Sequence, residues 1–136
     1  LESELKAQVQ ASGLKHRIRF MGASSAPQDM LRRWDGFIFT TTEAEGFGIA
    51  VAEAMAAGLP CVLSDVRAMR EVAGDSAYYV PVGDPAALAQ KIMGVANDFS
   101  AAVSMGQAAR LRAASLYSPQ VFARCYLAAL GLEDKP

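Results

Sequence analysis

Residues 36–60, GFIFTTTEAEGFGIAVAEAMAAGLP, decide the fold of this chain. Residues 36–41 are rich in β-branched and aromatic side chains and predict a buried strand. Residues 46–57 predict an apolar helix that Gly58 ends, with Pro60 just beyond it. A strand that leads through a glycine-containing loop into a helix is the repeating unit of α/β proteins.

The same alternation continues on both sides of this stretch. Further strands are expected at residues 17–21, 60–64 and 77–82. Further helices are expected at residues 1–12, 28–34, 68–74, 85–98, 101–116 and 119–130. Asp84 and Ser118 each precede a proline and are candidate N-caps. The order predicts one Rossmann-like α/β domain over residues 1–136, with a mainly parallel sheet, covering helices and a helical tail at about 101–131.

Composition excludes several classes of protein. The chain has 136 residues, of which 52% are hydrophobic and 20% are charged, as in a soluble globular domain. The net charge of −1 gives no basic field for nucleic acid. No apolar stretch reaches the roughly 20 residues of a membrane-spanning helix, and the polar N-terminus does not resemble a secretory signal. A cytoplasmic location is therefore expected.

The two cysteines do not form a metal-ligand spacing. Cys61 lies in the apolar run PCVLS, and Cys125 lies in the helical stretch FARCYLAAL. Both are expected to be small residues of the core. No cluster of carboxylates or histidines has ligand spacing either, so no metal and no cofactor is expected.

The loop between the strand at 36–41 and the following helix predicts a binding site. In parallel sheets, ligands bind beyond the carboxyl ends of the strands. Gly46 and Gly48 permit a close approach of the backbone to a ligand. A helix that starts there points free amides and its positive end at a phosphate. A glycine-containing turn without any ligand is the alternative.

Two glutamates flank this loop. Glu53 is the only charged residue between Gly46 and Gly58, so it is expected to be a buried carboxylate that needs hydrogen-bond donors. The donors would be ligand hydroxyls, a neighbouring loop, or Arg67 or Arg70. Glu45 precedes the helix, where a carboxylate is also favourable without a ligand. Together the two carboxylates suit a ligand with hydroxyls on both sides of a phosphate, which is the layout of a nucleotide-sugar.

At these residues the chain resembles the family-four retaining glycosyltransferases of the GT-B fold. The pattern Glu45-Gly-Phe-Gly-x4-Glu53-Ala-Met-Ala-x-Gly58-x-Pro60 looks like the family signature, in which seven residues separate two glutamates. The likeness covers nearly the whole chain, and one departure is Pro119, where the family usually has tryptophan. By this resemblance, the chain is the C-terminal, donor-binding part of such an enzyme.

The resemblance implies a role for each residue of the loop. Glu45 would be the catalytic carboxylate beside the transferred sugar, and Glu53 would bind the ribose hydroxyls. The donor-binding residues would be Gly46, Phe47, Gly48, Ile49 and Glu53, with backbone amides at the sugar or distal phosphate. Arg67, Arg70 and Glu71 are weaker candidates at the rim of the same cleft.

Several family features have no counterpart in this chain. The resemblance implies an arginine–lysine pair, two earlier strands and an N-terminal acceptor-binding domain, so the chain is expected to be a fragment that is inactive alone. Because the first two strands form the centre of such a sheet, we expect a rearranged sheet or self-association through unpaired edges. The complete enzyme would act in polysaccharide or glycolipid synthesis, in the cytoplasm or at the inner membrane face. A non-catalytic α/β nucleotide-binding or interaction module is the alternative function.

Overall fold

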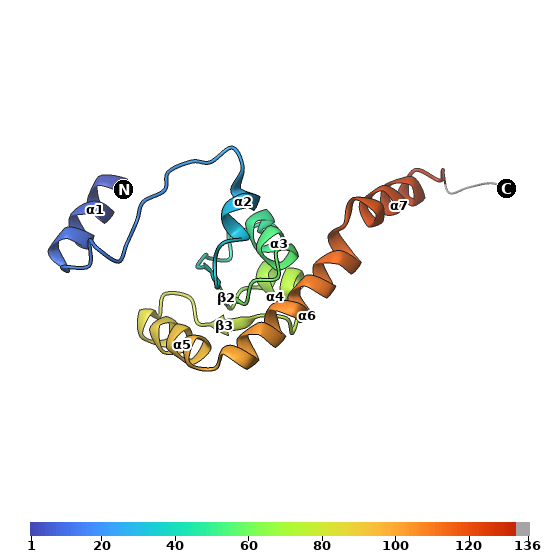
Figure 1. Ribbon diagram of the computed structural model, residues 1–136. Coiled ribbons are helices and arrows are strands. Elements are labelled where there is room, and N and C mark those ends of the chain that lie inside the picture. Colours follow the sequence, from blue (N-terminus) through green and yellow to red (C-terminus); the bar gives the residue numbers. More distant parts are fainter. Residues whose placement is uncertain (133–136) are drawn as a thin grey trace.

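The computed structural model describes residues 1–132 and consists of a small parallel sheet between two layers of helices (Figure 1). The strands are β1 (Phe37–Phe39), β2 (Cys61–Ser64) and β3 (Tyr78–Val80). The helices are α1 (Glu2–Ala11), α2 (Pro27–Leu31), α3 (Ile49–Ala56), α4 (Arg67–Ala73), α5 (Pro85–Asn97), α6 (Phe99–Tyr117) and α7 (Pro119–Ala129). The α/β class and the parallel sheet that the sequence predicts are confirmed.

The three strands lie in the order β1-β2-β3, and all are parallel. Side chains alternate between the two faces of a strand, so Phe37 and Cys61 share one face of the sheet, whereas Ile38 and Val62 share the other. Helices α3, α4 and α6 surround the first face and enclose the core. Helix α5 covers β2 and β3 on the second face.

The core is apolar and lies between β2 and the first helical layer. The strand expected at residues 60–64 is confirmed as β2, and every residue of β2 is buried. The largest fully buried side chains are Met55, Leu63, Met69, Val51, Val66, Val72 and Cys61. Met55 and Val51 come from α3, so the helix that follows the glycine-containing loop is one wall of the core.

Caps that the sequence predicts begin the later helices. The Asp84 carboxylate accepts a hydrogen bond from the Ala87 amide at 2.9 Å, and Ser118 accepts one from the Val121 amide at 3.4 Å. Both helices then start with proline, whose missing N–H costs nothing at that position. Gly58 ends the α3 segment with a φ of 81°, as the sequence also indicates.

The prediction of a strand at residues 17–21 is wrong. This segment has no regular secondary structure and is exposed, and in Figure 1 it lies in the stretch of chain that holds α1 away from the sheet. A strand is stable only when it pairs with a neighbour, and within residues 1–132 the sheet offers it none. The rearranged sheet is also not found, because the three strands keep their sequential order.

Strand β1 is less buried than expected. Phe37 and Phe39 are half-buried, and the Ile38 side chain is 48% exposed. The reason is its position: β1 is an edge strand, and helix α5 packs mainly on β2 and β3. Ile38 therefore lines a groove of about 410 Å³ together with Val62 and Phe99. Cys61 is buried as expected. The expectation that Cys125 is a core residue is wrong: Cys125 is exposed, because α7 packs mainly against α6.

Candidate functional site

The glycine-containing loop lies at the carboxyl end of β1 and leads into α3. Gly48 is the N-cap of α3 and has a left-handed conformation, with φ at 79°. Because a left-handed residue cannot be part of a right-handed helix, α3 begins at Ile49 and not at residue 46. Residues 45–48 thus form a tight turn in front of the helix, which we call the glycine-rich loop.

The Glu45 carboxylate binds the backbone of this loop. Its Oε1 atom accepts hydrogen bonds from the Gly46 amide at 3.0 Å and from the Gly48 amide at 3.2 Å. The side chain is half-buried. Glu45 therefore caps the turn. The Gly48 amide, which was expected to bind the ligand, instead donates its hydrogen bond to the Glu45 side chain.

Glu53 is exposed, so the expectation of a buried carboxylate is wrong. Only one face of α3 packs against the sheet and the neighbouring helices. The opposite face, with Ile49 at 69% exposure, Ala50, Glu53 and Ala56, is open to solvent. Within residues 1–132, Glu53 forms no ion pair, and Arg70 pairs with Asp65 instead. The alternative in which Arg70 donates hydrogen bonds to Glu53 is therefore wrong.

A groove joins part of the candidate site to α6. It measures about 470 Å³ and is lined by Phe47, Ile49 and Glu53 on one side and by Arg110 and Tyr117 of α6 on the other. The Phe47 and Tyr117 rings meet edge to face, with centroids 5.4 Å apart. The groove does not include Glu45, Gly46 or Gly48. The candidate residues thus divide into a turn capped by Glu45 and a groove that contains Glu53.

The sequence does not indicate Arg110 or Tyr117 as residues of the site. They come from a helix about 60 residues further along the chain, so no local pattern links them to the loop. The only signal is the likeness of Tyr117-Ser118 to the family, which gives the position of Tyr117 but not its contact with Phe47.

The rim candidates of the following helix have other partners. Arg70 forms a bidentate pair with Asp65, with Nε and Nη2 at 2.7 and 2.8 Å from the two carboxylate oxygens. This hydrogen bonding lowers the pKa of Asp65 and raises that of Arg70. The backbone carbonyl of Glu71 accepts a hydrogen bond from Arg112 at 2.8 Å. These contacts hold α4 in place, and they do not point to a ligand.

Over residues 1–132, no group of three or more His, Cys, Asp or Glu side chains is arranged to hold a metal ion. Over the same residues, no helix has the length and apolar character that crossing a membrane requires.

Comparison with known proteins gives consistent matches in sequence. The family model described as "Glycosyl transferases group 1" matches residues 1–98. The phosphatidyl-myo-inositol mannosyltransferase of Mycobacterium leprae (strain TN) is 40% identical over 96 residues, which are 68% of this chain and 25% of that protein. The chain therefore spans about a quarter of the length of this curated relative.

Solved structures share the fold. Anabaena Alr3699/HepE, crystallised with UDP and glucose, superposes with a TM-score of 0.86 at 23% identity, over 95% of this chain and 36% of that one. The C-terminal domain of a group 1 glycosyl transferase family protein, LpcC from Francisella tularensis, superposes with a TM-score of 0.74 at 23% identity. That match covers 88% of this chain and 63% of the solved domain.

Proposed function

Because the chain belongs to the group 1 glycosyl transferases, we propose that it is the donor-binding part of a retaining glycosyltransferase. In this proposal the whole protein moves a sugar from a nucleoside diphosphate sugar to an acceptor, and the anomeric configuration is retained. The observation that carries the proposal is the pair of carboxylates, Glu45 and Glu53, around a glycine-rich loop at the carboxyl end of β1. Ligands bind at this end of parallel sheets.

We assign the chemistry to the turn and the groove together. The amides of Phe47 and Ile49 and the positive end of α3 would face the distal phosphate and the sugar. Glu53 would accept hydrogen bonds from the ribose hydroxyls in the groove, and Glu45 would lie beside the transferred sugar. Charge develops on the departing diphosphate, so stabilisation of that charge would be the main catalytic contribution. No metal ion takes part in this proposal, and we expect that EDTA does not slow transfer.

The acceptor would be bound by a separate N-terminal domain of the same protein. The share of the relative's length that this chain spans leaves room for such a domain. Two exposed apolar surfaces support it: the groove beside Ile38, and α7, where Phe122 is 70% and Tyr126 58% exposed. Exposed apolar surfaces mark sites of contact with another protein segment, a membrane or a ligand. The name of the Mycobacterium leprae relative supports a glycolipid acceptor at a membrane surface.

Titration of the 136-residue chain with UDP, GDP and ADP, followed by backbone amide NMR, tests the donor site. We expect shifts that cluster at Gly46–Ile49, with affinity in the millimolar range, which corresponds to about −4 kcal/mol. Glu53→Ala should abolish the shifts, and Glu4→Ala on α1 is the matched control that should leave them unchanged. The nucleotide with the largest shifts identifies the base.

The outcomes separate the two candidate functions. Shifts that follow this pattern support the donor site. Shifts without sugar transfer by the complete protein from any of the corresponding donors would favour the alternative, a non-catalytic α/β module, as a nucleotide-binding module. Neither shifts nor transfer would favour it as an interaction module. Retention is tested on the complete protein, by the anomeric proton coupling of the first product formed.

A further inference from the structure

The glycine-rich loop rests on two side chains from other parts of the chain. A Cβ atom on Gly48 would lie 2.6 Å from the terminal methyl carbon of Met69, so this methyl group touches the backbone of the turn. Met69 itself is completely buried. Phe47, one residue earlier, packs on the ring of Tyr117. Met69 and Tyr117 therefore form a floor beneath the loop.

Both floor residues are held by α4. Met69 belongs to this helix, and the hydroxyl of Tyr117 donates a hydrogen bond to the Val72 carbonyl at 3.0 Å. Arg112 of α6 donates to the same carbonyl from its Nε atom at 2.9 Å. The place of the floor beneath the glycine-rich loop therefore depends on where α4 lies.

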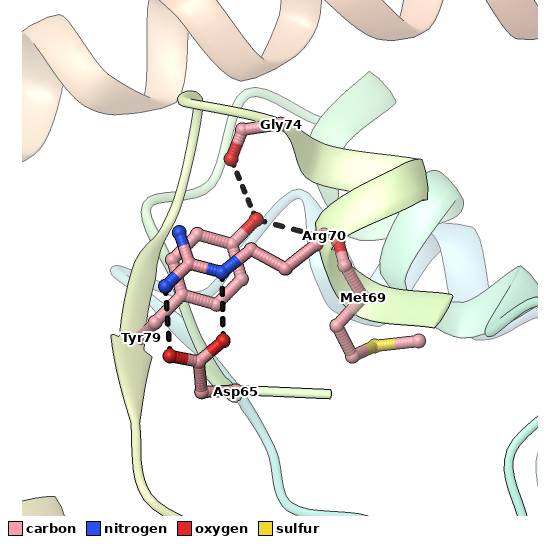
Figure 2. A network of polar contacts seen from close by, with 5 residues as sticks. All are labelled: Asp65, Met69, Arg70, Gly74 and Tyr79. Atoms are coloured by element: carbon pink, nitrogen blue, oxygen red, sulfur yellow. Dashed lines mark hydrogen bonds and ion pairs between the residues drawn. The ribbon is translucent and has the colours of Figure 1, made fainter. Parts of the chain in front are cut away.

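A polar network fixes α4 to the sheet, and Figure 2 shows its members. Asp65 follows β2 and holds the Arg70 guanidinium with two hydrogen bonds. This guanidinium lies over the Tyr79 ring of β3, with its central carbon 3.7 Å from the ring centroid. The Tyr79 hydroxyl donates to the Gly74 carbonyl at 2.6 Å and lies 3.3 Å from the Met69 carbonyl. The network thus joins the residue after β2, strand β3, and the middle and C-terminal end of α4.

The members of the network keep their charge states across the neutral range. Hydrogen bonding between Asp65 and Arg70 lowers the pKa of Asp65 and raises that of Arg70, and partial burial raises the pKa of the Tyr79 hydroxyl, which therefore stays a donor. The bidentate contact also requires an arginine, because a lysine ammonium cannot match both carboxylate oxygens and stack on a ring at once.

We propose that Met69 and Tyr117 are positioning residues for the nucleotide-sugar site, and that the Asp65–Arg70–Tyr79 network sets their place beneath the glycine-rich loop. The ligand part of this inference rests on the proposed function. The structural part does not, because it concerns the order of the loop in the free chain.

Amide hydrogen exchange of the free 136-residue chain tests the structural part. Tyr79→Phe removes one hydroxyl that anchors α4, and we expect the Gly48 amide to exchange roughly fivefold faster, the factor for one lost hydrogen bond. Met69→Ala should give a larger increase, and Met69→Leu should restore the protection. Tyr78→Phe on the same strand is the matched control, because its side chain lies on the opposite face of the sheet beside Lys91.

The amides of β2 distinguish positioning from a general loss of stability. If exchange of the Gly48 amide accelerates by the same factor as exchange of the β2 amides in every variant, Met69 and Tyr79 merely stabilise the fold, and the proposal is overturned. Faster exchange at Gly48 beyond that of β2, with rescue by Met69→Leu, supports it.

Titration with UDP tests the ligand part. The dissociation constant should rise in Tyr79→Phe and Met69→Ala by about the factor seen in the exchange of Gly48. Faster exchange with an unchanged dissociation constant would overturn the positioning role. If the unmodified chain and the complete protein bind no nucleotide, the proposed function fails, and the exchange data still decide whether the floor orders the loop.

Discussion

Gly46 and Gly48 lie two residues apart in the same loop and differ in what the structure requires of them. Gly48 has a φ of 79° and touches Met69, whereas Gly46 has no positive φ, and a Cβ there would meet nothing within 4 Å. Gly48→Ala should lower the free energy of unfolding by about 1–3 kcal/mol because it forces a strained backbone and displaces Met69. Gly46→Ala is the control and should change it by less than about 0.5 kcal/mol. Denaturant unfolding measures both, and equal losses would contradict this account of the turn.

The two cysteines should differ sharply in reactivity. Burial raises the pKa of Cys61 to about 12, and its side chain is inaccessible, whereas Cys125 is exposed. Because the thiolate is the reactive form, iodoacetamide at neutral pH should modify only Cys125 in the folded chain. Mass spectrometry after unfolding in denaturant should then show both sites modified. Early modification of Cys61 would mean that the core around β2 opens readily.

Individual residues of the site were predictable only where their role is local. The sequence indicates Gly48 as a turn residue and Glu45 as a group at the start of a helix, and the structure has both there. It does not indicate that Glu53 is exposed, because the burial of a helix face depends on what packs against it. Met69 and Tyr117 could not be assigned to the loop either, since their contacts join segments far apart in sequence.

Helix α6 approaches the turn after α3 closely at Gly106. A Cβ atom there would collide with the carbonyl oxygen of Gly58. Gly106→Ala should therefore destabilise the fold by about 1–3 kcal/mol, although alanine is the better helix former. Gly94→Ala on α5 meets nothing within 4 Å and should stabilise by up to about 1 kcal/mol. Thermal unfolding compares the two variants, and a stabilising Gly106→Ala would show that α6 can move away from the turn at Gly58 without cost.

Elements were predictable where local chemistry defines them. Helices α5 and α7 begin at their predicted caps, because an Asp or Ser side chain next to a proline satisfies the first amides without help from elsewhere. Residues 17–21 have side chains that suit a strand, but a strand also needs backbone hydrogen bonds from a neighbouring strand. Secondary structure that depends on a distant partner cannot be read from the segment itself.

At the scale of the whole molecule, the exposed apolar surfaces predict self-association of the isolated chain. Phe99 is 74% exposed beside the groove at Ile38, and Phe122 is 70% exposed on α7. Sedimentation velocity should show the average mass increase with concentration. Phe99→Ser and Phe122→Ser should reduce this increase, whereas Leu1→Ser, at an exposed position outside these two surfaces, should not. A monomer at every concentration would show that these surfaces do not attract one another.

The hydrogen bonds of Glu45 have a consequence for any anion that reaches the turn. One carboxylate oxygen already satisfies the amides of Gly46 and Gly48, so the turn carries its own counter-charge. A phosphate that takes these amides must displace the carboxylate, and binding is then an exchange of one acceptor for another. The affinity measured is the difference between two similar interactions. A preformed turn can therefore bind an anion weakly. Glu45→Ala should lower the dissociation constant of inorganic phosphate at the turn, even though it removes a proposed catalytic group.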